Sequence, residues 1–327
     1  MSKPISIREI AVLSGTSIAT VSRIINQKGR FSKETEERVL KVMKELDYQP
    51  NALARGLRQN KLNMIGVVVP DITLSFFSEL YHSIEAELYR LGYLSILVDT
   101  NENEQVEREY IENLSCLKIA GLIYLNGKRH RPAGGDFPIL YADRYPGAQA
   151  TDIHFIGCNN LKGGLLAARA LLEAGRTRPA IVRYDKDLAT QRQRYLGFRQ
   201  ALEEQGLSLD DARIIRADAV NMAAGYELTR DLCQRTQNFD SIFYTSDIFA
   251  CGGIRYLNEA GIRVPEDISI IGMDDTPLSS ILHLTTIRQP VEEMGILAAD
   301  SIVSLINGEK IPLTQTLDVK LVERNTL

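Results

Sequence analysis

The stretch S-I-R-E-I-A-V-L-S-G-T-S-I-A-T-V-S-R-I-I-N, residues 6–26, decides the first part of the fold. Ser6 and Glu9 form the S-x-x-E pattern of a capping box, which marks the start of a helix. Gly15 follows where that helix should end, because glycine readily adopts the left-handed conformation after a last helical turn. Ser17 is an N-cap candidate for a second helix. Two short helices joined by a glycine turn are typical of the helix-turn-helix, although an ordinary helical hairpin has the same local pattern.

Apolar residues recur at helical spacing through this stretch and the next twenty residues. Ser32 can cap a third helix, and acidic residues follow it in the first turns, where they suit the helix dipole. The predicted buried faces are Ile7, Ile10 and Ala11 in the first helix, Val21, Ile24 and Ile25 in the second, and Val39, Met43 and Leu46 in the third. Three such helices can close a small core in about fifty residues.

A short linker helix is predicted after this domain. Pro50 disfavours helix at Gln49 but can itself begin a new helix over residues 51–58. Gly56 makes that helix marginal in isolation. We therefore expect it to form only when it is paired with a partner chain and docked on DNA.

The pattern changes after Lys61 to alternating strands and helices. Residues 64–70 are a continuous apolar run, as in a parallel strand buried on both faces. Further strands are predicted at 94–99, 119–125, 139–141, 154–158, 179–183, 242–245 and 268–272, and helices at 77–91, 163–174, 194–204, 225–233 and 250–260. This alternation is typical of doubly wound α/β sheets, and its length favours two lobes with a ligand at the carboxyl ends of the strands.

The predicted fold class is therefore a small all-α helix-turn-helix domain followed by a two-lobed α/β sensor with doubly wound parallel sheets. The predicted boundaries are 1–49 for the helix-turn-helix domain, 50–61 for the hinge, and 62–327 for the core. Within the core we expect lobes at about 62–160 and 161–288, with the segment 289–327 crossing between them.

The charge distribution also distinguishes the N-terminal head, residues 1–61, from the rest of the chain, which we call the body. The chain has 327 residues and a net charge of −4, yet residues 1–61 carry 12 Lys/Arg and 6 Asp/Glu, a net of +6. The remaining residues carry 26 and 36, a net of −10. A basic head on an acidic body is what a DNA-binding module joined to a separate sensor would show.

Other classes of function find little support in the sequence. No apolar run approaches the ~20 residues of a membrane span, and the N-terminus has no apolar segment of a secretory signal, so we expect a cytoplasmic protein. The four cysteines and four histidines show no metal-ligand spacing. A P-loop and a G-x-S-x-G motif are both missing, so no catalytic residue, cofactor or metal is predicted.

A family resemblance follows from five motifs that occur in order along the chain. They are I-R-E-I-A-x-L-S-G-T-S-I-A-T-V-S-R-I-I-N, Y-Q-P-N-A-L-A-R-G-L-R, I-G-V-V-V-P-D, and I-S-I-I-G-M-D-D with L-T-T-I-R-Q-P. Together they span nearly the whole chain, which resembles the lactose-repressor/galactose-repressor family of bacterial transcription regulators. The resemblance implies a helix-turn-helix, a hinge helix and a sensor similar to periplasmic sugar-binding proteins. It also implies homodimers or tetramers on palindromic operator DNA, with a small effector, often a sugar, in the cleft.

The resemblance assigns DNA contacts to the second helix and to the hinge. Ile18 and Ala19 open the recognition helix, where apolar side chains can touch a thymine methyl, and Arg23 suits a bidentate contact with guanine. Leu57 matches the family's leucine wedge, which enters the minor groove and kinks the DNA. The remaining predicted contacts are Ser17, Thr20, Ser22 and Asn26 to phosphates, Leu53 and Ala54 between hinge helices, and Arg55 and Arg58 to phosphates or the minor groove.

The resemblance also assigns effector contacts at strand ends. One of Phe76 and Phe77 is expected in the core and the other in the site, and we favour Phe76 for the site. Relatives often read N-P-F-F where this chain reads L-S-F-F, and Val220-Asn221 stands where relatives often have an aromatic residue. The predicted set is Asp71, Phe76, Gln191, Arg194, Asn221, Ser246, Asp247 and Asp274, with Asp275 and Arg192 as alternatives.

These observations predict a homodimeric repressor of a carbohydrate operon, released from operator DNA by a small sugar. A corepressor or a non-sugar effector such as a nucleobase is the alternative, and a solute-binding transport protein or a sugar-modifying enzyme is more remote. No heptad tail follows residue 327, so a dimer is predicted rather than a tail-linked tetramer.

Overall fold

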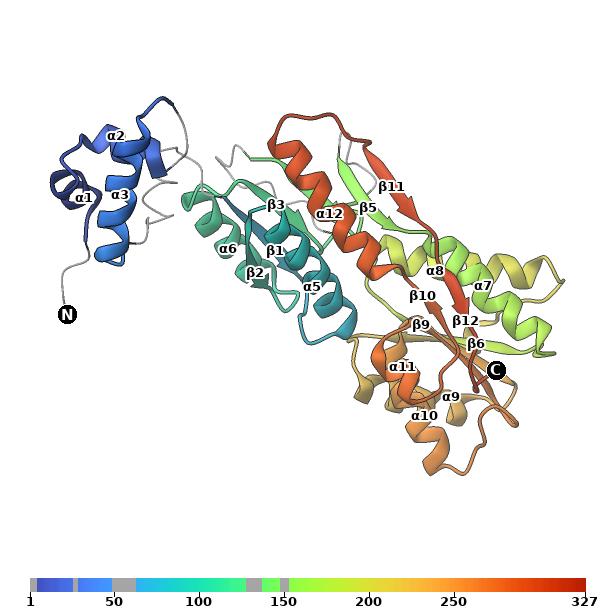
Figure 1. The fold of residues 1–327 in the computed structure, drawn as a ribbon. Coiled ribbons are helices and arrows are strands. Elements are labelled where there is room, and N and C mark those ends of the chain that lie inside the picture. Colours follow the sequence, from blue (N-terminus) through green and yellow to red (C-terminus); the bar gives the residue numbers. More distant parts are fainter. Residues whose placement is uncertain (1–4, 26–28, 49–62, 128–136, 148–152) are drawn as a thin grey trace. The chain divides into compact units, whose positions relative to one another are not determined.

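The computed structural model describes residues 5–25, 29–48, 63–127, 137–147 and 153–327. It divides into two compact units, Met1–Leu62 and Asn63–Leu327 (Figure 1). Several predicted DNA contacts lie outside the described residues: Asn26, Leu53, Ala54, Arg55, Leu57 and Arg58.

The first unit contains the predicted helix-turn-helix, with α1 (Ile7–Leu13), α2 (Ile18–Ile25) and α3 (Lys33–Glu45). The capping box at Ser6 is confirmed, because the Glu9 amide donates to the Ser6 hydroxyl at 3.3 Å and the Ser6 amide donates to the Glu9 carboxylate at 2.6 Å. Gly15 has φ +62°, the left-handed value expected at the turn. The Ser17 hydroxyl accepts from the Thr20 amide at 3.1 Å and so caps α2.

The core of this unit is small and comes from all three helices. Its buried residues are Ile10, Ala11, Val21, Ile24 and Val39. Ile7, Ile25, Met43 and Leu46 pack against them half-buried, so the predicted apolar faces are confirmed. Burial of these faces leaves the opposite side of α2 to solvent.

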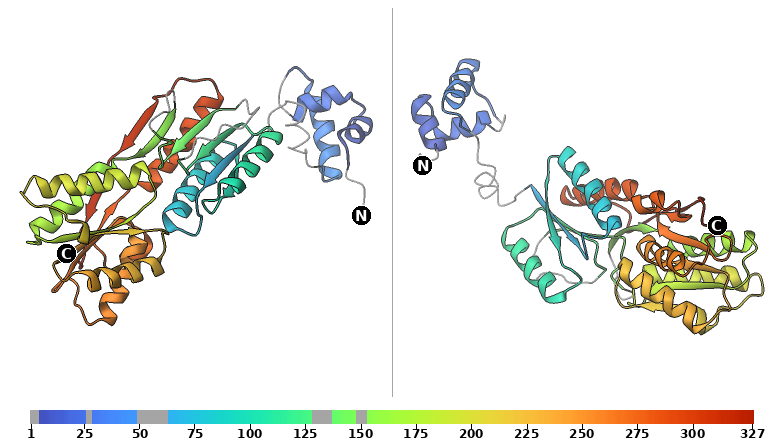
Figure 2. Two further views of the ribbon diagram at one scale, coloured as in Figure 1. Left: turned by 180° about the vertical axis from the view of Figure 1, so that it is seen from behind. Right: turned by 90° about the horizontal axis from the view of Figure 1, so that it is seen from below.

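The described part of the second unit has two six-stranded sheets, each belonging to one lobe (Figures 1 and 2). The first sheet has the order β11-β5-β4-β3-β1-β2, and all its neighbouring strands are parallel. Its strands are β1 (Met64–Val69), β2 (Leu94–Asp99), β3 (Gly121–Tyr124), β4 (Ile139–Ala142), β5 (His154–Cys158) and β11 (Thr314–Leu317). The helices α5 (Ser75–Arg90), α6 (Glu104–Cys116) and α12 (Val291–Ile306) cover this sheet.

The second sheet has the order β12-β10-β9-β8-β6-β7, in which only the β10–β12 pair is antiparallel among the described strands. Its strands are β6 (Pro179–Tyr184), β7 (Ile214–Ala217), β8 (Ser241–Tyr244), β9 (Ser269–Asp274), β10 (Thr286–Arg288) and β12 (Lys320–Val322). Its helices are α7 (Asn160–Glu173), α8 (Ala189–Glu203), α9 (Met222–Arg235), α10 (Asp247–Glu259) and α11 (Pro277–Ile281), with a short 3-10 turn at Asp211–Arg213.

Alternate residues of the central strands face opposite helix layers, as the period of a strand requires. In β1, Val67 belongs to the cluster formed with α5 and α12, whereas Val68 belongs to the cluster formed with α6. In β6, Ile181 packs with α7 and α8, and Val182 packs with α9 and α10. Both sheets are therefore covered on two faces, which confirms the predicted doubly wound class.

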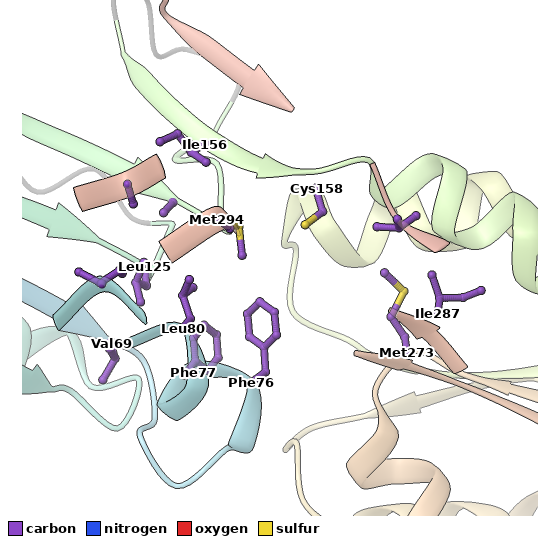
Figure 3. Packing of buried hydrophobic residues seen from close by; sticks show 14 of the residues in the cluster. Val69, Phe76, Phe77, Leu80, Leu125, Ile156, Cys158, Met273, Ile287 and Met294 are labelled. Atoms are coloured by element: carbon purple, nitrogen blue, oxygen red, sulfur yellow. The ribbon is translucent and has the colours of Figure 1, made fainter. Parts of the chain in front are cut away.

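The chain passes between the lobes three times within residues 153–327. It leaves the first sheet after β5 and enters α7, returns from β10 to α12, and crosses again from β11 to β12. These three crossings bring the carboxyl ends of strands from both lobes together. Figure 3 shows the resulting meeting of side chains, with Phe76, Phe77 and Met294 of the first lobe opposite Met273 and Ile287 of the second.

Candidate functional site

A cavity of about 180 Å³ lies between the two lobes of the second unit. Its first wall is the start of α5 and the loop after β4, and its second wall comes from α8, the end of β9 and the segments that follow β8, β9 and β10. The residues that line it are Thr73, Leu74, Ser75, Phe76, Phe77, Asp143, Arg144, Leu188, Thr190, Gln191, Arg194, Val220, Ser246, Ile248, Asp274, Thr276, Leu278 and Gln289. Its volume is roughly six times the ~30 Å³ share of a water molecule in the liquid, which suits a small ligand.

Two aromatic rings form the apolar part of the first wall (Figure 3). Phe76 and Phe77 meet edge to face with their ring centroids 5.1 Å apart. The guanidinium of Arg144 lies 5.2 Å above the centroid of Phe77. Both rings line the cavity, so the structure does not separate them into one core residue and one site residue as expected.

Asp274 is the most strongly coordinated carboxylate of the cavity. It is the last residue of β9 and has φ +124°, a value that L-residues rarely adopt. Ser246 donates to one carboxylate oxygen at 2.7 Å, and the Gln289 amide donates to the other at 2.7 Å. Burial raises the pKa of Asp274, while the nearby Arg194 guanidinium opposes that rise.

Arg194 reaches the cavity from α8 and is held by neutral partners. Its Nε donates to the Asn160 side-chain oxygen at 2.7 Å, and its Nη1 donates to the Thr245 carbonyl at 2.7 Å. The same Nη1 lies 3.8 Å from Asp274. Because the side chain is only 6% exposed, its position is fixed by the protein before any ligand enters.

Asp143 is a site residue that the sequence reasoning missed. It follows β4 with φ +61°, is buried, and its Oδ1 has no hydrogen-bond partner among the described residues. Burial is the main cause that raises its pKa to about 6, and Arg144 and Arg194 counteract part of the rise. The signal was available, since Asp143 ends a predicted strand in the way that Asp274 does. Gln289 was also missed, although it lies within the L-T-T-I-R-Q-P motif.

Three predicted effector residues do not line the cavity. The Asp71 carboxylate accepts from the amide and hydroxyl of Thr73 and thereby closes its own loop. The Asn221 side chain caps α9 by accepting from the Ala224 amide at 2.8 Å, and its neighbour Val220 lines the cavity instead.

The third, Asp247, is fully buried beneath Asp274. Its carboxylate accepts from the Thr276 amide at 2.8 Å and from the Thr286 hydroxyl at 2.6 Å. Burial, together with the charge of Asp274, raises the pKa of Asp247. Asp247 therefore joins α10 to the loop after β9 and to β10 from behind the cavity wall.

The structure also locates the predicted recognition-helix residues. Ser17, Ile18, Ala19 and Arg23 are exposed, with Ile18 at 37%, whereas Thr20 and Ser22 are half-buried. Within the described residues no group of three or more His, Cys, Asp or Glu could hold a metal ion, and no helix there is long and apolar enough to cross a membrane.

Comparison with known proteins gives the same two parts. Residues 6–51 match the family model described as bacterial regulatory proteins, lacI family, and residues 168–327 match that of a periplasmic binding protein-like domain. Over 98% of its length, the chain is 34% identical to the ribose operon repressor of Halalkalibacterium halodurans, of which it covers 96%. The chain belongs to the lacI family of bacterial regulatory proteins. It is therefore a DNA-binding transcriptional regulator rather than an enzyme.

Two further similarities place this lacI-family chain among its relatives. It is 32% identical to the HTH-type transcriptional repressor PurR of Haemophilus influenzae, over 92% of this chain and 91% of that protein. Among solved structures it matches the lac repressor dimer bound to operator and the anti-inducer ONPF, with a TM-score of 0.88, 26% identity and coverage of 99% of both chains. The fold and the family predicted from the sequence are thus confirmed.

Proposed function

We propose that this regulator is a repressor whose effector is a small uncharged molecule rich in hydroxyl groups, of the size of a single sugar ring. The carrying observation is a set of unpaired acceptors on residues that line the cavity. Asp143 Oδ1, Gln191 Oε1 and Gln289 Oε1 are buried and have no partner among the described residues. Such atoms are costly unless a ligand donates to them, and sugar hydroxyls are good donors.

The charges of the site disfavour a phosphorylated effector. Asp143 and Asp274 both line the cavity and would repel a phosphate. The two arginines are already engaged, Arg144 with the Glu102 carboxylate at 3.0 Å and Arg194 with Asn160 and a backbone carbonyl. A neutral ligand needs no further counter-charge. The ribose operon repressor relative supports a pentose as the first candidate.

The test compares matched neutral and phosphorylated sugars by thermal shift and calorimetry. We expect D-ribose or another free monosaccharide to raise the melting temperature, because a ligand of the folded state stabilises it. Ribose 5-phosphate and hexose 6-phosphates serve as the matched anionic set. Binding of a sugar phosphate in preference to its free sugar would overturn the proposal.

A corepressor of nucleobase type is the second candidate. The same acceptors could receive N–H groups of a purine. The two candidates are separated by including hypoxanthine and guanine in the binding panel. They are also separated by the sign of the effect, since an inducer lowers operator affinity and a corepressor raises it.

The proposed DNA partner is a palindromic operator read by α2. Exposed Ile18 and Ala19 would contact base edges, Arg23 a guanine, and Ser17, Thr20 and Ser22 the phosphates. The hinge residues named above and Asn26 keep their proposed roles in the minor groove and on the backbone. This function places the protein in the bacterial cytoplasm, and on the nucleoid when it is bound to the operator.

The proposed assembly is a homodimer, as in the lac repressor structure bound to operator. In this chain β2 is an edge strand, and Leu94 on it is 57% exposed, with Leu97 at 37% and Tyr89 of α5 at 73%. Large exposed apolar groups beside an unpaired strand edge suit a protein interface. Leu94→Asp should shift the mass in sedimentation from dimer to monomer. An unchanged dimer would exclude this edge from the interface.

A further inference from the structure

The loop after β2 holds one carboxylate between the two lobes. Asn101 and Glu102 have φ values of +46° and +54°, so two consecutive non-glycine residues adopt the left-handed conformation. The Glu102 amide donates to the Pro70 carbonyl at 2.9 Å, which fixes the loop on the end of β1. The unfavourable backbone conformation therefore occurs at the residue whose side chain extends from the first lobe towards the second.

Glu102 bonds to both lobes at once. On its own lobe, Arg144 Nη1 donates to Oε1 at 3.0 Å. On the second lobe, the Tyr184 hydroxyl donates to Oε2 at 2.7 Å, and Lys186 Nζ donates to the same oxygen. Tyr184 ends β6 and Lys186 lies in the loop that follows, so one carboxylate bridges the carboxyl ends of β2 and β6.

The bridge is partly shielded from water. The side chain of Glu102 is 20% exposed and that of Arg144 is 8% exposed. Burial alone would raise the pKa of Glu102, but donation from Lys186, Arg144 and Tyr184 outweighs it and lowers the pKa to about 2. Glu102 is therefore charged at every physiological pH. Charge-assisted bonds of this kind are stronger than those of fully exposed ion pairs.

The bridge also reaches the cavity, although Glu102 does not line it. Arg144 lines the cavity and lies over Phe77, and Glu102 is the carboxylate with which it pairs at 3.0 Å. A rotation of one lobe against the other would separate Glu102 from Lys186 and Tyr184, which belong to the second lobe. The same rotation would leave the Glu102–Arg144 pair intact, because both belong to the first lobe.

We propose that Glu102 is an inter-lobe clasp, which positions Arg144 at the cavity and holds the two lobes in their present arrangement through Lys186 and Tyr184. The clasp biases the equilibrium between lobe arrangements whatever ligand occupies the cavity. Its test therefore does not depend on the identity of the effector, and failure of the sugar assignment would leave it standing.

The experiment measures the distance between the lobes by double electron–electron resonance on the full chain. Spin labels are placed at Glu112→Cys on α6 and Gln234→Cys on α9, both exposed positions, in a background with Cys116→Ser and Cys233→Ser. The labelled protein is mixed with an excess of unlabelled protein, so that the distance is measured within one protomer of the dimer. The native sequence at the clasp should give one narrow distance distribution. Glu102→Gln and Lys186→Met should each broaden it or shift it by several ångström, and the double variant should add nothing further.

The matched control is Asp187→Asn, which removes an exposed ion pair with Arg192 at 3.2 Å inside the second lobe. It should leave the distribution unchanged. The same narrow distribution in Glu102→Gln and Lys186→Met would overturn the clasp. If Glu102→Gln does not fold by circular dichroism, Lys186→Met still decides, because Lys186 is half-exposed.

A double-mutant cycle gives an independent readout. The unfolding equilibrium constants of Glu102→Gln, Lys186→Met and the double variant should show a coupling of at least about fivefold between the two positions. Additive effects would contradict the clasp as firmly as an unchanged distance.

Discussion

Arg194 lies 3.8 Å from Asp274 across the cavity wall, yet its two hydrogen bonds of 2.7 Å go to Asn160 and to the Thr245 carbonyl. Hydrogen bonds to other residues therefore hold Arg194 and Asp274 near each other, rather than their mutual attraction. Each keeps its orientation when a ligand comes between them. This preorganisation lowers the entropic cost of binding a small, weakly hydrophobic molecule.

Asp274→Asn should weaken effector binding by ten- to a hundredfold. A hydrogen bond to a charged group contributes about 1.5–3 kcal/mol, and the amide that replaces the carboxylate presents one acceptor oxygen instead of two. Calorimetry with the effector identified in the sugar panel measures the loss, and operator affinity without effector should stay near that of the native protein. The matched control is Asn221→Ser, because a serine still caps α9 and position 221 does not line the cavity. Equal losses in both variants would remove Asp274 from the binding site.

Effector affinity should rise with pH between about 5 and 7. Burial raises the pKa of Asp143 to about 6, and ligand hydroxyls that donate to its carboxylate favour the ionised form. Protonation below pH 6 therefore opposes binding, and the affinity levels off above pH 7. Asp143→Asn should flatten this profile, and a profile that stays as steep in the variant would assign the titration to another group.

The free energy of unfolding should fall with rising pH because of Asp143, which is opposite to the trend in effector affinity. The pKa of Asp143 in the folded protein lies above its ordinary value of 3.8, so the folded state binds the proton more tightly. The unfolding free energy should therefore fall by about 2 kcal/mol as the pH rises from 4 to 7. Urea denaturation of the native protein and Asp143→Asn at both pH values isolates this contribution. A difference between the two proteins that does not change with pH would contradict it.

Most of the fold could be predicted because its central strands are buried on both faces and read as apolar runs. The predicted strands 64–70 and 119–125 contain β1 and β3, which are buried almost throughout. The strands β7, β10, β11 and β12 were not predicted, because they are short, and β11 and β12 carry polar or charged residues such as Thr314 and Lys320. β11 forms through pairing with β5, which is distant in sequence, and a local pattern cannot reveal such a pairing.

The site was predicted less completely for a related reason. Three of the predicted residues line the cavity as expected, and each lies in a helix or at the carboxyl end of a strand. They are Arg194, Ser246 and Asp274. Asp71 and Asn221 occupy comparable loops, but each satisfies a nearby backbone amide instead. An Asp or Asn side chain that accepts from a nearby backbone amide is no longer directed at a ligand. The same residue types can serve either purpose, so the sequence does not separate a loop-closing residue from a ligand-binding one. Only the three-dimensional placement separates the two outcomes.

Gly164→Ala should destabilise the second lobe by about 3 kcal/mol or more. A Cβ at position 164 would clash with two backbone atoms of α8, because it would lie 2.0 Å from the Arg194 carbonyl oxygen and 2.7 Å from the Phe198 amide nitrogen. Helices α7 and α8 therefore have to separate, which also displaces Arg194 from the cavity. Urea denaturation gives the loss of stability, and Arg169→Ala on the exposed side of α7 is the control. Native stability of Gly164→Ala would show that the two backbones are not in contact.

Leu57→Ala should lower operator affinity by about tenfold or more while effector affinity stays the same. The family resemblance assigns Leu57 to a wedge between base steps, and a methyl group cannot unstack them. Fluorescence anisotropy with a selected operator measures the change, and Leu196→Ala, on the surface of α8, controls for loss of an exposed apolar side chain. Unchanged DNA binding in Leu57→Ala would exclude the wedge.

The measurement that tests the central claim most directly is operator affinity with and without the cavity ligand. The operator is first selected from random duplex DNA by the full-length protein, and its dissociation constant is then measured at saturating effector for the native protein and Asp274→Asn. Coupling between the cavity and the DNA-binding helices predicts a change of at least fivefold in the native protein, which needs a higher effector concentration in the variant. A ligand that binds the cavity and leaves operator affinity unchanged would contradict the account.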